Sequence, residues 1–118
     1  MRDRIRLPFR FDVEAMRRDL RHLEDAAWVE HFVKDNYEGN WSVLPLRVPA
    51  GARHPVETIY SDPSCETFVD TPLLEQSPKF REALARFHCR LDSVRLMRLT
   101  PGSVIKPHRD HDLGAEFG

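Results

Sequence analysis

The residues best suited to chemistry form one short cluster near the end of the chain, His108-Arg109-Asp110-His111-Asp112. The cluster follows a stretch that we expect to be a strand, and side chains at i and i+2 of an extended backbone point the same way. His108 and Asp110 can therefore present an imidazole and a carboxylate to one metal ion, while Arg109 points away. These are two of the three protein ligands in the facial triad of non-haem Fe(II) oxygenases.

Two neighbouring residues are alternative ligands. His111 reaches the same metal only if the strand breaks after Asp110, because it otherwise faces away, whereas Asp112 shares the parity of His108 and Asp110. Five charged or basic residues in a row also suit a solvated loop, so the H-x-D tripeptide alone is a weak signal. His31 is not spaced along the sequence as a metal ligand would be, and we expect it at the surface or at a rim.

The elements that position the cluster begin with an expected edge strand and a helix. Residues Arg4 to Phe11 alternate in polarity, and Pro8 favours an edge position. Asp12 is a suitable N-cap for a helix from Val13 to Leu23. The apolar stripe expected for that helix contains Val13, Met16, Leu20, Leu23 and Ala27.

Further along, strand formers from Trp41 to Val48 predict a strand in which Pro45 marks an edge or a bulge. Ser77 is a suitable N-cap for a second helix, with Pro78 at the first helical position. We expect this helix to end near His88 or Cys89.

The segment before the cluster reads as two antiparallel strands joined by a turn at Pro101-Gly102. Ser93 to Thr100 predicts the first strand, with Val94, Leu96 and Arg98 on one face. Thr100-Pro101-Gly102-Ser103 has proline and glycine where a type II turn requires them, and Val104-Ile105 resumes the extended chain. Helices early and strands late favour the α+β class.

Composition limits the range of functions. The chain has 118 residues, 41% of them hydrophobic, which suits a single domain spanning residues 1–118. Its formal net charge of −1 argues against a nucleic-acid partner. No apolar run is long enough to span a membrane, and the charged N-terminus does not resemble a secretory signal, so we expect a cytoplasmic protein without a membrane partner.

A resemblance to a known family adds to these inferences. The stretch SVRLMRLTPGSVIKPHRDHDLGAEFG resembles the strand–turn–strand around the H-x-D motif of the aspartyl/asparaginyl β-hydroxylase family, whose bacterial branch includes proline cis-hydroxylases. Upstream, YEGNWSVLPLR and DTPLLEQSPKFREALARFHCRLDSVRL are also similar to that family. The resemblance extends from about Tyr37 to Gly118.

The resemblance implies an Fe(II)- and 2-oxoglutarate-dependent dioxygenase that uses O₂ to hydroxylate an amino acid, either free proline or an Asp or Asn side chain in a peptide. It implies a double-stranded β-helix, a jelly-roll or cupin-like barrel, preceded by N-terminal helices. Carried over residue by residue, His108 and Asp110 match the first two iron ligands.

The chain departs from the family pattern at its end. It stops at Gly118, before the family's second iron-ligating histidine and the basic residue that binds 2-oxoglutarate. We therefore expect a truncated hydroxylase-like domain without the C-terminal half of its barrel, inactive when alone. The alternative is a non-catalytic remnant or interaction module that forms a homo-oligomer through open strand edges.

Two residues on the expected strand Trp41 to Val48 are candidates for substrate binding. Parity places Trp41 and Arg47 on one face, where Arg47 could bind a substrate carboxylate. The simpler alternative is a core tryptophan and a surface arginine.

Overall fold

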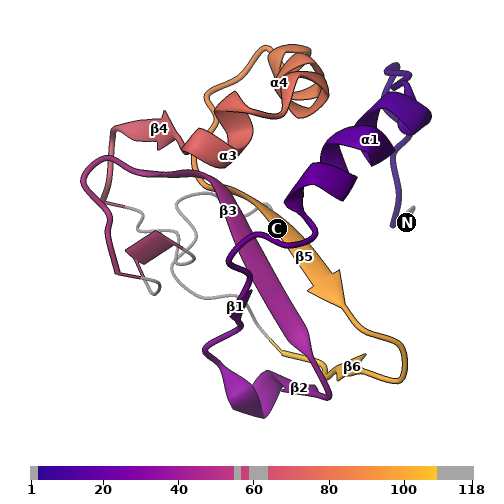
Figure 1. Ribbon diagram of the computed structural model, residues 1–118, viewed down its shortest axis with the longest axis vertical. Helices are drawn as coiled ribbons and strands as arrows, with labels where there is room; N and C mark the ends of the chain where they lie inside the picture. Colours follow the sequence, from indigo (N-terminus) through magenta and orange to yellow (C-terminus); the bar gives the residue numbers. More distant parts are fainter. Residues whose placement is uncertain (1–2, 55–56, 59–63, 109–118) are drawn as a thin grey trace.

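The computed structural model describes residues 3–54, 57–58 and 64–108 and has a mixed α+β architecture (Figure 1). A four-stranded antiparallel sheet lies at its centre, and a separate pair of short strands lies at one end. The described residues form antiparallel sheets without a closed barrel. The strands are β1 (Val29–Glu30), β2 (Tyr37–Glu38), β3 (Trp41–Pro49), β4 (Phe68–Asp70), β5 (Val94–Leu99) and β6 (Val104–Ile105).

Strand β3 is the centre of the larger sheet, because it pairs with β1 and β4 along one edge and with β5 along the other. The sequence predicted this strand and allowed an edge or a bulge at Pro45. The bulge is present: Pro45 is opposite Arg95, while Arg47 is opposite Val94, so one extra residue of β3 lies between them. A bulge lets proline occupy an interior strand, where its missing N–H would otherwise break the ladder.

The two faces of this sheet differ. On the helix face, Leu44 and Leu46 of β3 form the buried core with Leu23 and Leu74. Three helices lie on this side (Figure 1): α1 (Val13–Leu23), α3 (Pro72–Glu75) and α4 (Pro78–Ala85). The opposite face, called here the Trp41 face, carries Trp41, Val43, Pro45, Arg95, Met97 and Leu99.

Helix α1 has the predicted bounds and the predicted cap, since Ala15 N–H donates to Asp12 Oδ1 at 3.1 Å. The predicted apolar stripe is wrong in part, because Val13 and Leu20 are exposed. The buried residues are Ala15, Asp19 and Leu23. The small Ala15 and the short Asp19 allow α4 to pack closely here, and this contact decides which side of α1 is buried.

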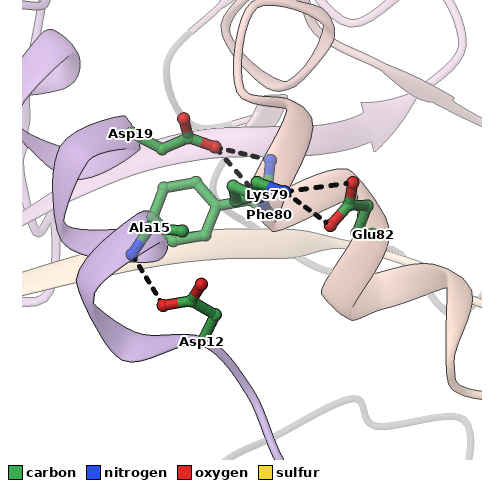
Figure 2. A network of polar contacts seen from close by, with 6 residues as sticks. All are labelled: Asp12, Ala15, Asp19, Lys79, Phe80 and Glu82. Atoms are coloured by element: carbon green, nitrogen blue, oxygen red, sulfur yellow. Dashed lines mark hydrogen bonds and ion pairs between the residues drawn. The ribbon is translucent and has the colours of Figure 1, made fainter.

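Asp19 also caps α4 from the neighbouring helix, as Figure 2 shows. Its Oδ2 accepts hydrogen bonds from the backbone N–H groups of Lys79 at 2.7 Å and Phe80 at 3.3 Å. Ser77 occupies the N-cap position, as predicted, but its side chain makes no capping bond and donates instead to the Leu73 carbonyl at 2.8 Å. The Asp19 carboxylate of α1 therefore caps α4, a role that the sequence predicted for Ser77.

Helix α4 ends at Ala85, earlier than predicted. The N–H groups of Arg86 and Phe87 bond to the carbonyls three residues back, which tightens and closes the last turn. The Arg86 guanidinium bonds to the Arg10 carbonyl, and the Phe87 ring packs against Phe9 at 5.1 Å between centroids. These contacts with the N-terminal segment take the place of another helical turn.

The predicted strand from Arg4 to Phe11 is wrong. These residues form no strand, and Ile5 is 86% exposed. A strand requires a partner, and no described strand pairs with this segment. Phe9 and Phe11 pack instead against the guanidinium of Arg86, 5.5 Å from each ring.

Strand β5, the turn at Pro101-Gly102 and β6 are all present, as the sequence predicted. Ser103 N–H donates to the Thr100 carbonyl at 3.0 Å, and Gly102 has the positive φ of 80° that a type II turn needs. However, β6 pairs with β2 instead of with β5. The short 3-10 helix η1 (Lys34–Asn36) precedes β2 and places it beside β6.

Gly39 is the residue that allows this arrangement at the end of β2. Its φ is +88°, and a Cβ added there would lie 2.3 Å from Ser103 Oγ. In the space that the missing side chain leaves, Asn40 N–H donates to Ser103 Oγ at 2.8 Å. The turn after β5 is thereby joined to the start of β3.

No helix in the described part of the chain is both long and apolar enough to cross a membrane.

Candidate functional site

His108 is the part of the predicted metal site that lies within the described residues. It follows β6, whose position is set by the pairing of Ile105 with Tyr37 and by a 2.8 Å bond from Lys106 N–H to the Asn36 carbonyl. The His108 side chain is exposed. As the sequence predicted, His108 comes after an extended segment, although β6 ends at Ile105, before Lys106 and Pro107.

A backbone contact orients the imidazole of His108. Its Nδ1 lies 2.7 Å from the Lys106 carbonyl oxygen. A carbonyl oxygen can only accept, so Nδ1 carries the proton and Nε2 of the neutral ring carries the lone pair. Histidines that bind metals commonly donate their second N–H to a carbonyl or carboxylate in this way. In this tautomer Nε2 is the ring nitrogen that can accept a bond.

Trp41 is the nearest described neighbour of His108 with an aromatic ring. The two ring centroids are 6.1 Å apart, and the ring planes are tilted by 51°. Trp41 is only 5% exposed, yet its indole Nε1 has no hydrogen-bond acceptor in the described structure. An unpaired buried N–H costs about 1–3 kcal/mol.

Two other rings hold Trp41 in place. His31 stacks on the indole with centroids 3.9 Å apart and planes 5° from parallel. Tyr37 meets the indole edge-on at 5.6 Å, and its hydroxyl donates to the His31 carbonyl at 3.0 Å. His31, Tyr37 and Trp41, called here the aromatic cluster, therefore form a rigid wall on the Trp41 face.

The surface position predicted for His31 is wrong, because the residue is 9% exposed. Its backbone N–H donates to the Trp41 carbonyl at 2.8 Å, which extends the pairing of β1 with β3. Its Nδ1 accepts the Val33 N–H at 3.2 Å, so the neutral ring carries its proton on Nε2. The alternation of Val29, Glu30 and His31 along a strand is the sequence signal that could have placed it.

The predicted parity of Arg47 with Trp41 is wrong, because the bulge in β3 places Arg47 opposite Val94 on the helix side. The guanidinium pairs with the Asp70 carboxylate and bonds to the carbonyls of Phe68 at 3.1 Å and Leu91 at 3.3 Å. These contacts join β4 and the segment before β5 to β3. A substrate role for Arg47 stays a prediction that these contacts do not favour.

The remaining candidates, Arg109, Asp110, His111 and Asp112, lie outside the described residues. Within the described part, no group of three or more His, Cys, Asp or Glu side chains is arranged to hold a metal ion. The site can therefore be described from His108 and the aromatic cluster alone.

An ion pair lies at the rim of the aromatic cluster. Lys34 Nζ is 2.7 Å from the Glu30 carboxylate and 5.7 Å from the centroid of the Tyr37 ring. The hydrogen bond that the Lys34 ammonium donates to the Glu30 carboxylate is the main reason that the pKa of Lys34 rises above its usual value. The ammonium therefore stays charged beside the cluster throughout the neutral range.

Comparisons of the chain with protein-family models, with curated proteins and with solved structures found no match.

Proposed function

We propose that the chain is part of an Fe(II)- and 2-oxoglutarate-dependent dioxygenase that hydroxylates an amino acid, with His108 and Asp110 as iron ligands. The observation that carries the proposal is the hydrogen bond from His108 Nδ1 to the Lys106 carbonyl, which leaves the lone pair on Nε2. Imidazole and carboxylate donors together suit Fe(II) with positions open for other ligands. The resemblance of the segment from Ser93 to Gly118 to the aspartyl/asparaginyl β-hydroxylases supports the same assignment.

The surroundings of His108 support a site that also takes an organic molecule. The unpaired Nε1–H of Trp41 lies on the ring nearest to His108 and can donate to a carboxylate or carbonyl oxygen of 2-oxoglutarate or of the substrate. His31 and Tyr37 fix the indole, so little conformational freedom is lost when this bond forms. In this proposal Trp41 binds and orients, and the metal supplies the reaction with O₂.

The fold proposed for the complete site is a double-stranded β-helix to which this chain contributes one part. The antiparallel pairing of β3 with β5 and the turn into β6 are consistent with such a part. The proposal keeps the cytoplasmic location expected from the sequence. Any metal bound here by His108 and Asp110 completes its shell with water, buffer or a neighbouring molecule.

Metal affinity of the purified chain tests the proposal without requiring turnover. Anaerobic titration calorimetry with Fe(II) is expected to show one site, weakened at least tenfold by His108→Ala and by Asp110→Ala. His111→Ala is the matched control, since it removes an imidazole from the same cluster and is expected to leave most of the affinity. Because imidazole must be neutral to bind a metal, the affinity is expected to fall in acid.

Succinate formation from 2-oxoglutarate measures the reaction itself. Any turnover found is expected to require Fe(II) and to be lost in His108→Ala and Asp110→Ala. Turnover or metal affinity that survives His108→Ala but is lost in His111→Ala would show that the opposite strand face carries the ligands. Unchanged metal affinity in all three variants would overturn the proposal.

A further inference from the structure

The N-terminal segment, α1 and α4 border an open cavity of about 290 Å³ on the helix side of the sheet. Three cationic residues line it: Arg10 shortly before α1, Lys79 in the first turn of α4 and Arg86 just after the end of α4. Two carboxylates, Asp12 and Glu82, line it as well. The chemistry of the cavity depends on which of these charges already have a partner within the protein.

Both carboxylates are already engaged, as Figure 2 shows. Asp12 Oδ1 accepts the Ala15 N–H as the cap of α1, where the helix dipole also favours its negative charge. The Glu82 carboxylate pairs with the Lys79 ammonium at 3.2 Å, so these two charges offset each other. The two arginines therefore provide the positive charge that the cavity can offer to a ligand.

Neither arginine forms an ion pair with a carboxylate in the part of the chain that the structure describes. The Arg86 guanidinium lies 5.5 Å from the rings of both Phe9 and Phe11, and it donates one hydrogen bond to the Arg10 carbonyl. These contacts hold it in place while its other N–H groups, and all those of the Arg10 side chain, have no acceptor among the described residues. Guanidinium groups bind carboxylate and phosphate oxygens through two parallel hydrogen bonds.

We propose that this cavity binds a small organic anion, whose carboxylate or phosphate group lies between the guanidinium groups of Arg10 and Arg86. The apolar part of the anion packs against Phe11 and Met16, which line the cavity together with the buried Ala83. The volume is at the lower end of the range for ligand pockets, which favours a small molecule. This inference is independent of the proposed dioxygenase function, because that site lies on the other face of the sheet.

Methyl NMR of the purified chain tests the proposal with two probes, benzoate and phenyl phosphate. The methyl signals of Met16 and Ala83 are expected to shift and to saturate at millimolar concentrations of at least one probe. The methyl signal of Met97, on the Trp41 face, is expected to stay unchanged. Phenol has the same ring without the anionic group and is expected to cause no saturable shift. Saturation by benzoate alone, or by phenyl phosphate alone, identifies the preferred anion.

A pair of arginine variants tests whether the cavity itself attracts the anion. Arg10→Gln removes a side chain that makes no hydrogen bond in the described structure, so the circular dichroism spectrum is expected to be unchanged. The affinity for the anion is expected to fall about tenfold, as for the loss of a charge-assisted hydrogen bond. Arg6→Gln is the matched control, because it removes the same charge from the same segment but does not line the cavity. It is expected to change the affinity less than twofold.

Three results would overturn the proposal. The first is the absence of a saturable shift at Met16 and Ala83 with either anion. The second is binding of phenol as tight as that of the anions, which would show an apolar cavity without a role for the arginines. The third is an equal loss of affinity in Arg10→Gln and Arg6→Gln, which would show attraction to the basic segment as a whole.

Discussion

The two faces of the central sheet are built in different ways. The helix face is covered by three helices around Leu44 and Leu46, and its residues are typical of a protein core. On the Trp41 face, Trp41 is buried beneath the His31 ring and Val43 is fully buried, but Met97 and Leu99 are about half exposed. His108 and the unpaired indole N–H lie on this second face. The comparison indicates that the helix face provides most of the stability, whereas the Trp41 face carries the residues of the proposed site.

The largest expected difference between the faces is in core packing. Leu44 is fully buried among the core leucines, and Leu44→Ala is expected to cost about 2–5 kcal/mol of unfolding free energy because it leaves a cavity. Met97→Ala, the matched change in β5 on the other face, is expected to cost less than about 1 kcal/mol because its side chain is half exposed. Urea denaturation of both variants measures the difference. Equal losses would contradict the distinction between the faces.

A smaller effect is expected at Gly39, which joins β2 to β3 beside the Trp41 face. Gly39→Ala combines a positive φ with a contact of 2.3 Å to Ser103 Oγ, and the strained backbone alone costs about 1–3 kcal/mol. Gly102→Ala is the control, because its φ is +80° but nothing lies within 4 Å of the added Cβ. Thermal denaturation is expected to rank Gly39→Ala as the less stable variant, and the reverse order would show that the Ser103 contact is unimportant.

A similar or smaller loss of unfolding free energy is expected at the contact between α1 and α4, on the helix face. Removing the capping carboxylate by Asp19→Ala is expected to cost about 1–2 kcal/mol. Asp19→Asn retains an acceptor oxygen and is expected to recover part of this loss. Ser77→Ala is not expected to uncap α4, because the serine makes no capping bond. A larger loss in Ser77→Ala than in Asp19→Ala, measured by urea denaturation, would contradict the assignment.

The smallest effect is expected at Glu57, in a segment that belongs to neither face. Its Oε2 accepts hydrogen bonds from the backbone N–H groups of Arg53 and His54, each at 3.0 Å, and these bonds lower the pKa of the carboxyl below 4.5. A depressed pKa stabilises the fold above pH 4.5, and this contribution is lost as the pH falls through the folded-state pKa. NMR titration of the Glu57 side chain is expected to give a midpoint below 4.5, and a midpoint at or above 4.5 would show that the two bonds do not persist in solution.

Local sequence signals predicted much of the fold, and non-local contacts account for the errors. The bounds of α1 and β5 and the turn at Gly102 follow from periodicity and turn chemistry, which act within a few residues. The buried side of α1 depends on Asp19 reaching α4, some 60 positions away, and no local pattern contains that information. The expected strand from Arg4 to Phe11 had a suitable pattern but no described partner strand.

The candidate site was predicted in part for the same reason. His108 lies after an extended segment, as the sequence predicted. Trp41, whose ring lies near that of His108, was identified from the sequence as a candidate on the strand that is β3 in the structure. The bulge near Pro45 reversed the parity of Arg47, because one inserted residue turns every later side chain to the other face. His31 was missed because its burial depends on stacking against Trp41.

The two tryptophans provide the most direct test of the proposed metal site, because they lie on opposite faces of the sheet. Trp41 lies 6.1 Å from His108, whereas Trp28 packs against the helix-side core and donates its indole N–H to the Leu23 carbonyl at 2.8 Å. Paramagnetic Mn(II), used at substoichiometric levels in place of Fe(II), broadens nearby resonances steeply with distance. We expect the indole N–H signal of Trp41 to disappear first while that of Trp28 persists, and His108→Ala to abolish the effect. Equal broadening of both signals, or broadening that survives His108→Ala, would contradict a metal site at His108.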